Sequence, residues 1–162
     1  MLRVGTVGTS SIMRTIQEAI RLTDGMECRV VYSRTEEQGR AFAAEMGVPE
    51  HCTDYAAMLE RSDLDLIDIA SPNRFHAEQA LAALEHGKHV FSEKPLAADM
   101  EEGTKLMALA KEKNLLMGGA PDTFMGAGIQ TARKVIDDGL IGDVIGATCA
   151  MIQHGPETWH PD

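Results

Sequence analysis

The sequence predicts an α/β fold with a doubly wound parallel sheet, and three observations lead to this prediction. Short apolar runs alternate with longer segments of helical periodicity along most of the 162 residues. A glycine directly follows the first apolar run and opens the first helical segment. Hydrophobic residues make up 44% of the chain, which is enough for one compact core. Strands that alternate with helices form right-handed crossovers, so the sheet is parallel and has helices on both faces.

The predicted strands are short runs rich in β-branched and other apolar residues. The third run in chain order is apolar at most positions, as expected for a strand buried on both faces. The five predicted strands of the main sheet cover residues 3–7, 27–32, 64–70, 89–92 and 115–117.

The predicted helices are bounded by polar caps and by glycine or proline. The first carries an apolar stripe and stops near Gly25, and the second ends at Gly47. Asp99 and Glu102 have the spacing of a reciprocal capping pair at the start of a later helix. The five helices cover residues 11–22, 36–46, 55–60, 75–85 and 99–114.

The alternation is complete near Gly119, so we expect a first domain over residues 1–119 and the start of a second, incomplete α/β domain over 120–162. The second part is expected to contain a helix over 129–138 and a strand over 144–152. No later segment remains to pair with that strand. Either it joins the sheet of another subunit in a homo-oligomer, or the chain stops before its second domain is complete.

The charge and the cysteine content exclude several classes of protein. A formal net charge of −10 disfavours nucleic acid and anionic membrane surfaces as partners. No apolar run approaches the roughly 20 residues of a membrane-spanning helix, and the first residues do not resemble a secretion signal. The three cysteines are far apart and show no metal-binding spacing with the histidines. We expect a cytoplasmic protein with free thiols and no metal.

The first turn after a predicted strand resembles a phosphate-binding loop. In dinucleotide-binding (Rossmann) folds this turn has the pattern Gly-x-Gly-x-x-Gly, and the helix N-terminus that follows binds pyrophosphate. Here Ser10 replaces the second glycine and Met13 the third. An ordinary turn with serine caps is the alternative reading. The candidate cofactor-binding residues of this loop are Gly8, Thr9, Ser10, Ser11 and Ile12.

The end of the second predicted strand favours NADP over NAD. Enzymes that select NAD usually have an acidic residue here to bind the ribose hydroxyls. This chain has Ser33 and Arg34 instead. A guanidinium forms bidentate hydrogen bonds with a phosphate, and a hydroxyl can add another donor. A surface arginine without a ligand is the alternative.

Two further segments follow predicted strands and together resemble one known family. The first contains Ser71-Pro72-Asn73 and then His76. The second contains Gly87-Lys88-His89-Val90 and then Glu93-Lys94-Pro95. Both segments, in this order and context, resemble the glucose–fructose oxidoreductase/inositol dehydrogenase (Gfo/Idh/MocA) family, and the resemblance extends over essentially the whole chain.

The resemblance implies an NAD(P)-dependent oxidoreductase that acts on a sugar, a polyol or a related compound. It implies that Lys94 is catalytic: the ammonium lies beside the nicotinamide and hydrogen-bonds the reacting oxygen of the substrate. Further cofactor contacts are implied for Ser71, Pro72, Asn73, Glu93 and Lys94, and for His76 unless it only caps or packs its helix. The family's second domain supplies a further acid/base, which the chain lacks, so this chain alone is expected to have an incomplete active site.

One segment departs from the family pattern, and two other functions remain open. Residues 120–124 differ from the Asn-x-Arg-Phe-like segment of many members, which puts substrate contacts there in doubt. The chain could be a non-catalytic dinucleotide-binding or sensor module. It could also be an interaction protein that oligomerises through its last strand and binds no cofactor.

Overall fold

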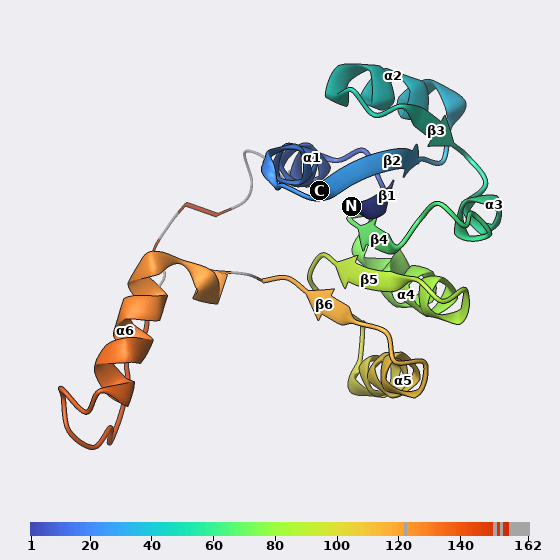
Figure 1. Cartoon of the computed structure of the whole chain (residues 1–162). Helices are drawn as coiled ribbons and strands as arrows, with labels where there is room; N and C mark the ends of the chain where they lie inside the picture. The colour runs from blue at the N-terminus through green and yellow to red at the C-terminus, as the bar shows by residue number, and fades with distance from the viewer. Residues whose placement is uncertain (122, 151, 153, 156–162) are drawn as a thin grey trace. The chain divides into compact units, whose positions relative to one another are not determined.

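The computed structural model describes residues 1–121, 123–150, 152 and 154–155. The chain forms two compact units, Met1–Pro121 and Asp122–Asp162. The first unit contains the sheet and five of the helices (Figure 1). None of the described helices is long and apolar enough to cross a membrane.

The first unit is built on a six-stranded parallel sheet with the order β3-β2-β1-β4-β5-β6. From β1 the next strands are added on one side (β2, β3), and from β4 they are added on the other (β5, β6), so the topological switch point of this doubly wound fold lies between β1 and β4. This confirms the predicted fold class. The strands are β1 (Leu2–Val7), β2 (Met26–Tyr32), β3 (Glu50–Cys52), β4 (Leu66–Ile69), β5 (His89–Ser92) and β6 (Met117–Gly119).

Helices connect successive strands, and the predicted helices of this unit are confirmed to within a few residues. The sequence analysis missed β3, because three residues beside β2 are too short to show a periodicity. The helices are α1 (Ser11–Leu22), α2 (Glu36–Met46), α3 (Tyr55–Leu59), α4 (His76–Glu85) and α5 (Met100–Glu112), and a 3-10 turn, Asn73–Phe75, precedes α4.

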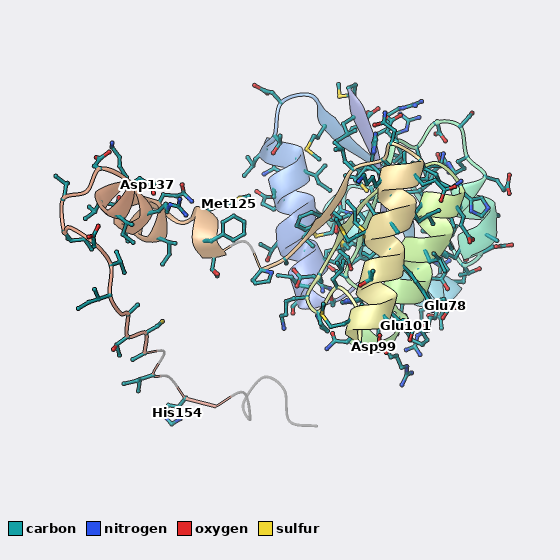
Figure 2. The ribbon with its side chains drawn as sticks, turned by 90° about the horizontal axis from the view of Figure 1, so that it is seen from below. Glu78, Asp99, Glu101, Met125, Asp137 and His154 are labelled. Atoms are coloured by element: carbon teal, nitrogen blue, oxygen red, sulfur yellow. The ribbon has the colours of Figure 1, made fainter. Side chains whose placement is uncertain are left out.

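The cap of α5 forms largely as the sequence predicted, at the helix start marked by Asp99 in Figure 2. The carboxylate of Asp99 accepts a hydrogen bond from the Glu102 amide at 2.9 Å. The carboxylate of Glu102 accepts in return from the amide of Ala98 at 3.1 Å. The returning bond therefore reaches one residue further back than in the usual capping box.

Two clusters of buried side chains hold the helices against the sheet. One contains Met13 of α1 and Phe42 of α2 together with Val31 of β2. The other contains residues of α3, α4 and α5 together with Val30, the neighbour of Val31. Since successive residues of a strand point to opposite faces, the two clusters lie on the two faces of the sheet.

Lys88, from the Gly-Lys-His-Val motif, lies at the amino end of β5, the edge of the sheet opposite to the strand ends that carry the candidate site. Its side chain is buried, with 8% exposed. Its Nζ donates to the backbone oxygens of Arg61 at 2.6 Å and Leu64 at 3.0 Å. Lys88 therefore closes the loop that leads into β4 and has a structural role.

Asp68, in the middle of β4, is a buried acid without a compensating partner. It is 6% exposed, and its Oδ1 has no hydrogen-bond partner among the described residues. Burial, with a smaller contribution from the negative charge of Glu93, raises the pKa of Asp68 from 3.8 to about 7. The ionised form of this side chain therefore destabilises the fold.

The second unit contains a 3-10 turn, Thr123–Met125, and α6 (Ala127–Asp137). The chain leaves this helix through Gly139, which has a φ of +70°. The expected strand over 144–152 is not present in its described residues, 144–150 and 152. A strand requires hydrogen bonds to a neighbouring strand, and none of the described residues provides them. Residues 151 and 153 and 156–162 lie outside the described part of the chain.

Replacing Lys88 by Met should lower the free energy of unfolding by about 3 kcal/mol, because two buried carbonyl groups lose a charged donor. Urea denaturation of the chain measures this change. Lys113→Met is the matched control, since Lys113 is exposed and donates to one carbonyl at 3.2 Å. Equal effects of the two substitutions would contradict the structural role of Lys88.

Replacing Asp68 by Asn should stabilise the fold in a pH-dependent way. The raised pKa of Asp68 means that its stabilising contribution is complete below about pH 4 and is lost as the pH rises toward 7. The variant should therefore match the wild type near pH 4 and exceed it by up to about 4 kcal/mol at pH 8. Unfolding curves at several pH values, with exposed Asp24→Asn as the control, measure the difference. A difference that does not change with pH would contradict the burial argument.

Candidate cofactor site

The residues that the sequence singled out meet at the carboxyl edge of the sheet. The register places Val7 of β1 opposite Tyr32 of β2 and opposite Ile69 of β4. Ile69 is in turn opposite Ser92 of β5. The loops that follow these four strands therefore begin at one level, side by side at the switch point, where ligands bind in such sheets.

Gly8 is at the closest approach between two of these loops. It has a φ of +109°, and its amide donates to the Tyr32 carbonyl oxygen at 3.0 Å. A Cβ at this position would lie 2.7 Å from the carbonyl oxygen of Ala70. Both the conformation and the lack of space require glycine here, as they do at the first glycine of a phosphate-binding turn.

The first turn of α1 has no side-chain cap. Ser10 is its N-cap residue, but the hydroxyl donates to the Ala70 carbonyl oxygen at 3.3 Å and caps no amide. The Ser10 hydroxyl is therefore engaged with the backbone at the end of β4. The amides of the first turn have no carbonyl acceptors inside the helix. Since Ser10, Ser11 and Ile12 are exposed, these amides are available to an anion.

Met13, in place of the third glycine of the pattern, belongs to the core. Its side chain is fully buried and packs in the cluster that contains Phe42 and Ala70. The departure from the glycine pattern therefore serves helix packing and leaves the outer side of the loop open.

Ser33 is buried in this conformation, whereas Arg34 lies at the surface. Ser33 is 4% exposed, and its hydroxyl donates to the Thr35 backbone oxygen at 2.6 Å. Gly39 packs directly over it, since a Cβ there would lie 2.6 Å from the Ser33 hydroxyl. In this conformation the hydroxyl holds the turn into α2, and a phosphate contact of Ser33 stays a prediction. Arg34 is exposed beside that turn.

The loop after β4 exposes Pro72 and Asn73, while Ser71 is tied to the helix behind it. The Ser71 hydroxyl donates to Gln79 Oε1 at 2.6 Å. The backbone oxygen of Gln79 accepts from the Tyr55 hydroxyl at 2.8 Å. Asn73 is therefore exposed where a ligand could contact it, whereas the Ser71 side chain is hydrogen-bonded within the chain.

His76 lies behind the site, between its two loops. It is 1% exposed, so in this conformation it offers no surface to a cofactor, contrary to the predicted contact. Its Nε2 is 2.7 Å from the Ser71 backbone oxygen, and its Nδ1 is 2.8 Å from that of Pro95. A neutral ring donates through one nitrogen only. Because both neighbours are carbonyl oxygens, a neutral His76 donates to the loop after β4 or to the loop after β5, and its ring packs between the two.

The loop after β5 presents Lys94 at the surface. The amide of Glu93 donates to the Ile69 backbone oxygen at 2.8 Å and so continues the sheet by one residue. The Glu93 carboxylate accepts from the Lys94 amide at 3.2 Å. Lys94 is exposed, and the peptide bond to Pro95 is cis. Among the described residues its ammonium has no hydrogen-bond or ion-pair partner.

Two residues of the site region were missed by sequence reasoning. Gln79 is one turn after His76 on α4, and that spacing could have indicated a shared face toward the loop. Asp68 is inside a strand, where the pattern gives no sign of an unpartnered carboxyl group. No group of three metal-ligating side chains occurs in the described part of the chain.

This edge fits a long ligand with phosphate groups. A close-packed glycine turn and an uncapped helix start suit a pyrophosphate, and exposed Arg34 adds a cation at the neighbouring strand end. Lys94 adds a second cation on the other side of the switch point. These local groups offer an anion favourable contacts although the chain as a whole carries a net charge of −10.

Comparison with known proteins gives similar sequences over most of the chain. A 1,5-anhydro-D-fructose reductase from Ensifer adhaerens is 34% identical over 148 residues, which are 91% of this chain and 44% of that protein. A scyllo-inositol 2-dehydrogenase (NADP(+)) from Bacillus subtilis is 33% identical over 126 residues, 77% of this chain and 38% of that protein. The chain thus spans well under half the length of these relatives.

Solved structures agree with the sequence relatives. A 3-ketoreductase from Actinomadura kijaniata, crystallised with NADP and TDP-benzene, superimposes with a TM-score of 0.80 and 31% sequence identity. The match covers 88% of this chain and 44% of that one. Residues 2–119 match the family model described as the oxidoreductase family with an NAD-binding Rossmann fold. The chain therefore belongs to the Gfo/Idh/MocA family of oxidoreductases, with residues 2–119 matching its NAD-binding Rossmann fold.

Proposed function

We propose that the chain is the cofactor-binding portion of an NAD(P)-dependent oxidoreductase that transfers hydride between nicotinamide and a sugar, polyol or related hydroxyl or carbonyl compound. One observation carries this proposal. The glycine turn at Gly8 and the exposed Lys94 follow strands on the two sides of the switch point, and β4 alone separates those strands. A dinucleotide laid across this edge has its pyrophosphate at α1 and its reactive end toward Lys94.

The proposed preference for NADP rests on Arg34. Its guanidinium is exposed at the end of β2, where the adenosine ribose lies in doubly wound folds. Positions 33 and 34 carry Ser33 and Arg34 and no acidic residue. An acidic side chain at either position would repel a 2′-phosphate. Two relatives are described with NADP, which supports the same preference.

Lys94 is proposed as the catalytic residue. The nicotinamide, when bound, supplies or accepts the hydride. The Lys94 ammonium donates a hydrogen bond to the reacting oxygen of the substrate and stabilises the negative charge that develops there. The Glu93 carboxylate accepts from the Lys94 amide, and the Pro95 carbonyl oxygen lies 2.8 Å from His76 Nδ1, so the backbone has a contact on both sides of Lys94.

We also propose a substrate class and an assembly for the whole protein. A sugar or polyol is proposed because relatives named for such substrates are 34% and 33% identical to this chain over the aligned residues. The boundary near residue 119 and the completion of the site by a second domain, in a cytoplasmic homo-oligomer, belong to the same proposal.

The purified chain should bind NADPH more tightly than NADH, and replacing Arg34 by Ala should remove most of that difference. Loss of a charge-assisted phosphate contact is expected to weaken NADPH binding about tenfold and NADH binding little. Calorimetric titration at matched ionic strength measures both affinities, with Arg40→Ala on the exposed side of α2 as the control. Equal weakening of both cofactors would remove the case for NADP. Binding of neither by the wild type would contradict the proposed function.

Replacing Lys94 by Met should leave NADPH affinity within about threefold and reduce turnover of the whole protein about 100-fold or more. The expected separation arises because the ammonium acts on the substrate oxygen. Steady-state kinetics with a panel of polyols and aldoses, beside the cofactor titration, measures it. Lys105→Met, an exposed lysine paired with Glu101, is the control. Unchanged turnover of the Lys94 variant would show that another group is catalytic.

A further inference from the structure

Arg14 is bound to the backbone of the glycine turn that precedes its own helix. One terminal nitrogen of its guanidinium donates to the Thr9 backbone oxygen at 3.3 Å and to that of Ser10 at 3.4 Å. The side chain therefore folds back along the first turn of α1 and meets the inner side of the loop.

The other nitrogens of the same guanidinium are fixed by α2. Nε and the second terminal nitrogen donate to the two carboxylate oxygens of Glu45 at 2.7 Å and 2.8 Å. The guanidinium carbon lies 5.3 Å from the centre of the Phe42 ring, which supports the group from one face. Because a guanidinium is planar and rigid, this anchor also fixes the direction of the donor that reaches the loop.

The two carbonyl contacts set the direction of the amides that face a ligand. In a trans peptide unit the N–H points away from the C=O. Holding the carbonyls of Thr9 and Ser10 on the Arg14 side therefore turns the amides of Ser10 and Ser11 to the other side. These amides stand at the exposed, uncapped start of α1.

Two glycines of the expected pattern are absent from this loop. Ser10 and Met13 occupy those positions, and the Ser10 hydroxyl ties the loop to Ala70 from one side. Arg14 ties the same peptide units from the other side. The loop is thus held between β4 and α2 by groups that leave its amides free.

We propose that Arg14, anchored by Glu45, is a positioning residue for the pyrophosphate of the cofactor, which holds the loop carbonyls so that the Ser10 and Ser11 amides point at the ligand. This inference rests on the proposed dinucleotide site and assigns a role to residues that do not touch the ligand. The alternative is that Arg14 acts only through its positive charge, by attracting the phosphates.

The two roles predict opposite effects of Glu45→Gln. If Arg14 acts through its charge, loss of the neighbouring carboxylate makes the region more positive and NADPH binds more tightly. If Arg14 acts by position, loss of the anchor releases the guanidinium and NADPH binds more weakly. Glu18→Gln is the matched control, because Glu18 pairs with Arg21 on the same helix, away from the loop.

Titration of the chain with NADPH should show about three- to tenfold weaker binding for Glu45→Gln, and at least as large a loss for Arg14→Met. Arg14→Lys should also bind weakly, because an ammonium keeps the charge but cannot hold a carboxylate and two carbonyls in one plane. The double variant Arg14→Met/Glu45→Gln should bind NADPH as Arg14→Met does, since both substitutions remove the same contact between Arg14 and Glu45. Wild-type affinity of Arg14→Lys, or tighter binding by Glu45→Gln, would overturn the proposal.

A second readout needs no cofactor. Amide ¹⁵N relaxation of Ser10 and Ser11 should show larger fast motion in Glu45→Gln and Arg14→Met than in the wild type and Glu18→Gln. If the wild type binds no dinucleotide, the proposed function fails while this measurement still decides whether Arg14 fixes the loop. Unchanged order parameters in both variants would overturn the positioning role.

Discussion

The contact between the turn at Gly8 and the end of β4 is the constraint on which the site depends. A single Cβ at Gly8 would lie 2.7 Å from the Ala70 carbonyl oxygen, so the two loops meet backbone against backbone. This approach places the start of α1 beside the loop that carries Asn73. The His76 ring packs between that loop and the one that carries Lys94. A side chain at Gly8 would separate the parts of the site that the switch point brings together.

The site also shows how an acidic protein can offer a place for an anionic ligand. Many acidic side chains of the described residues pair with arginine or lysine away from the site, as Asp65 does with Arg3 near the amino end of β1. At the strand ends the groups that face outward are backbone amides, Arg34 and Lys94. Of the carboxylates in that region, Glu93 accepts a hydrogen bond from the amide next to it, and Glu36 lies 2.7 Å from His51 Nε2. Burial and the charge of Glu93 together raise the pKa of Asp68 to about 7, so its negative charge is largely absent below that pH.

The sequence was sufficient to predict the sheet and the edge at which the candidate residues gather, because both follow from alternation and from motifs that come directly after strands. It could not predict which of those residues face outward. Ser33 and His76 are buried because their polar atoms meet backbone carbonyls of Thr35, Ser71 and Pro95, and a backbone acceptor leaves no mark in the sequence. The structural role of Lys88 could not be predicted for the same reason, because its ammonium donates to backbone carbonyls of Arg61 and Leu64.

The expected strand over 144–152 failed for a different reason. Its apolar residues are typical of a strand, but pairing depends on a neighbour, and the described residues contain none for it. The pattern of apolar residues therefore predicted strands correctly where the described chain contains a neighbouring strand, and failed at 144–152, where the described residues contain none.

The most direct test of the account is a map of backbone amide shifts in the ¹⁵N spectrum of the chain on addition of NADPH. The account predicts changes confined to residues 8–12, 34–36, 72–74 and 93–95, at the carboxyl ends of four strands. It predicts none at Lys88 and the loop at 61–64, which lie at the opposite edge. Changes at that opposite edge, or on the exposed face of α5 with the strand ends unaffected, would contradict it.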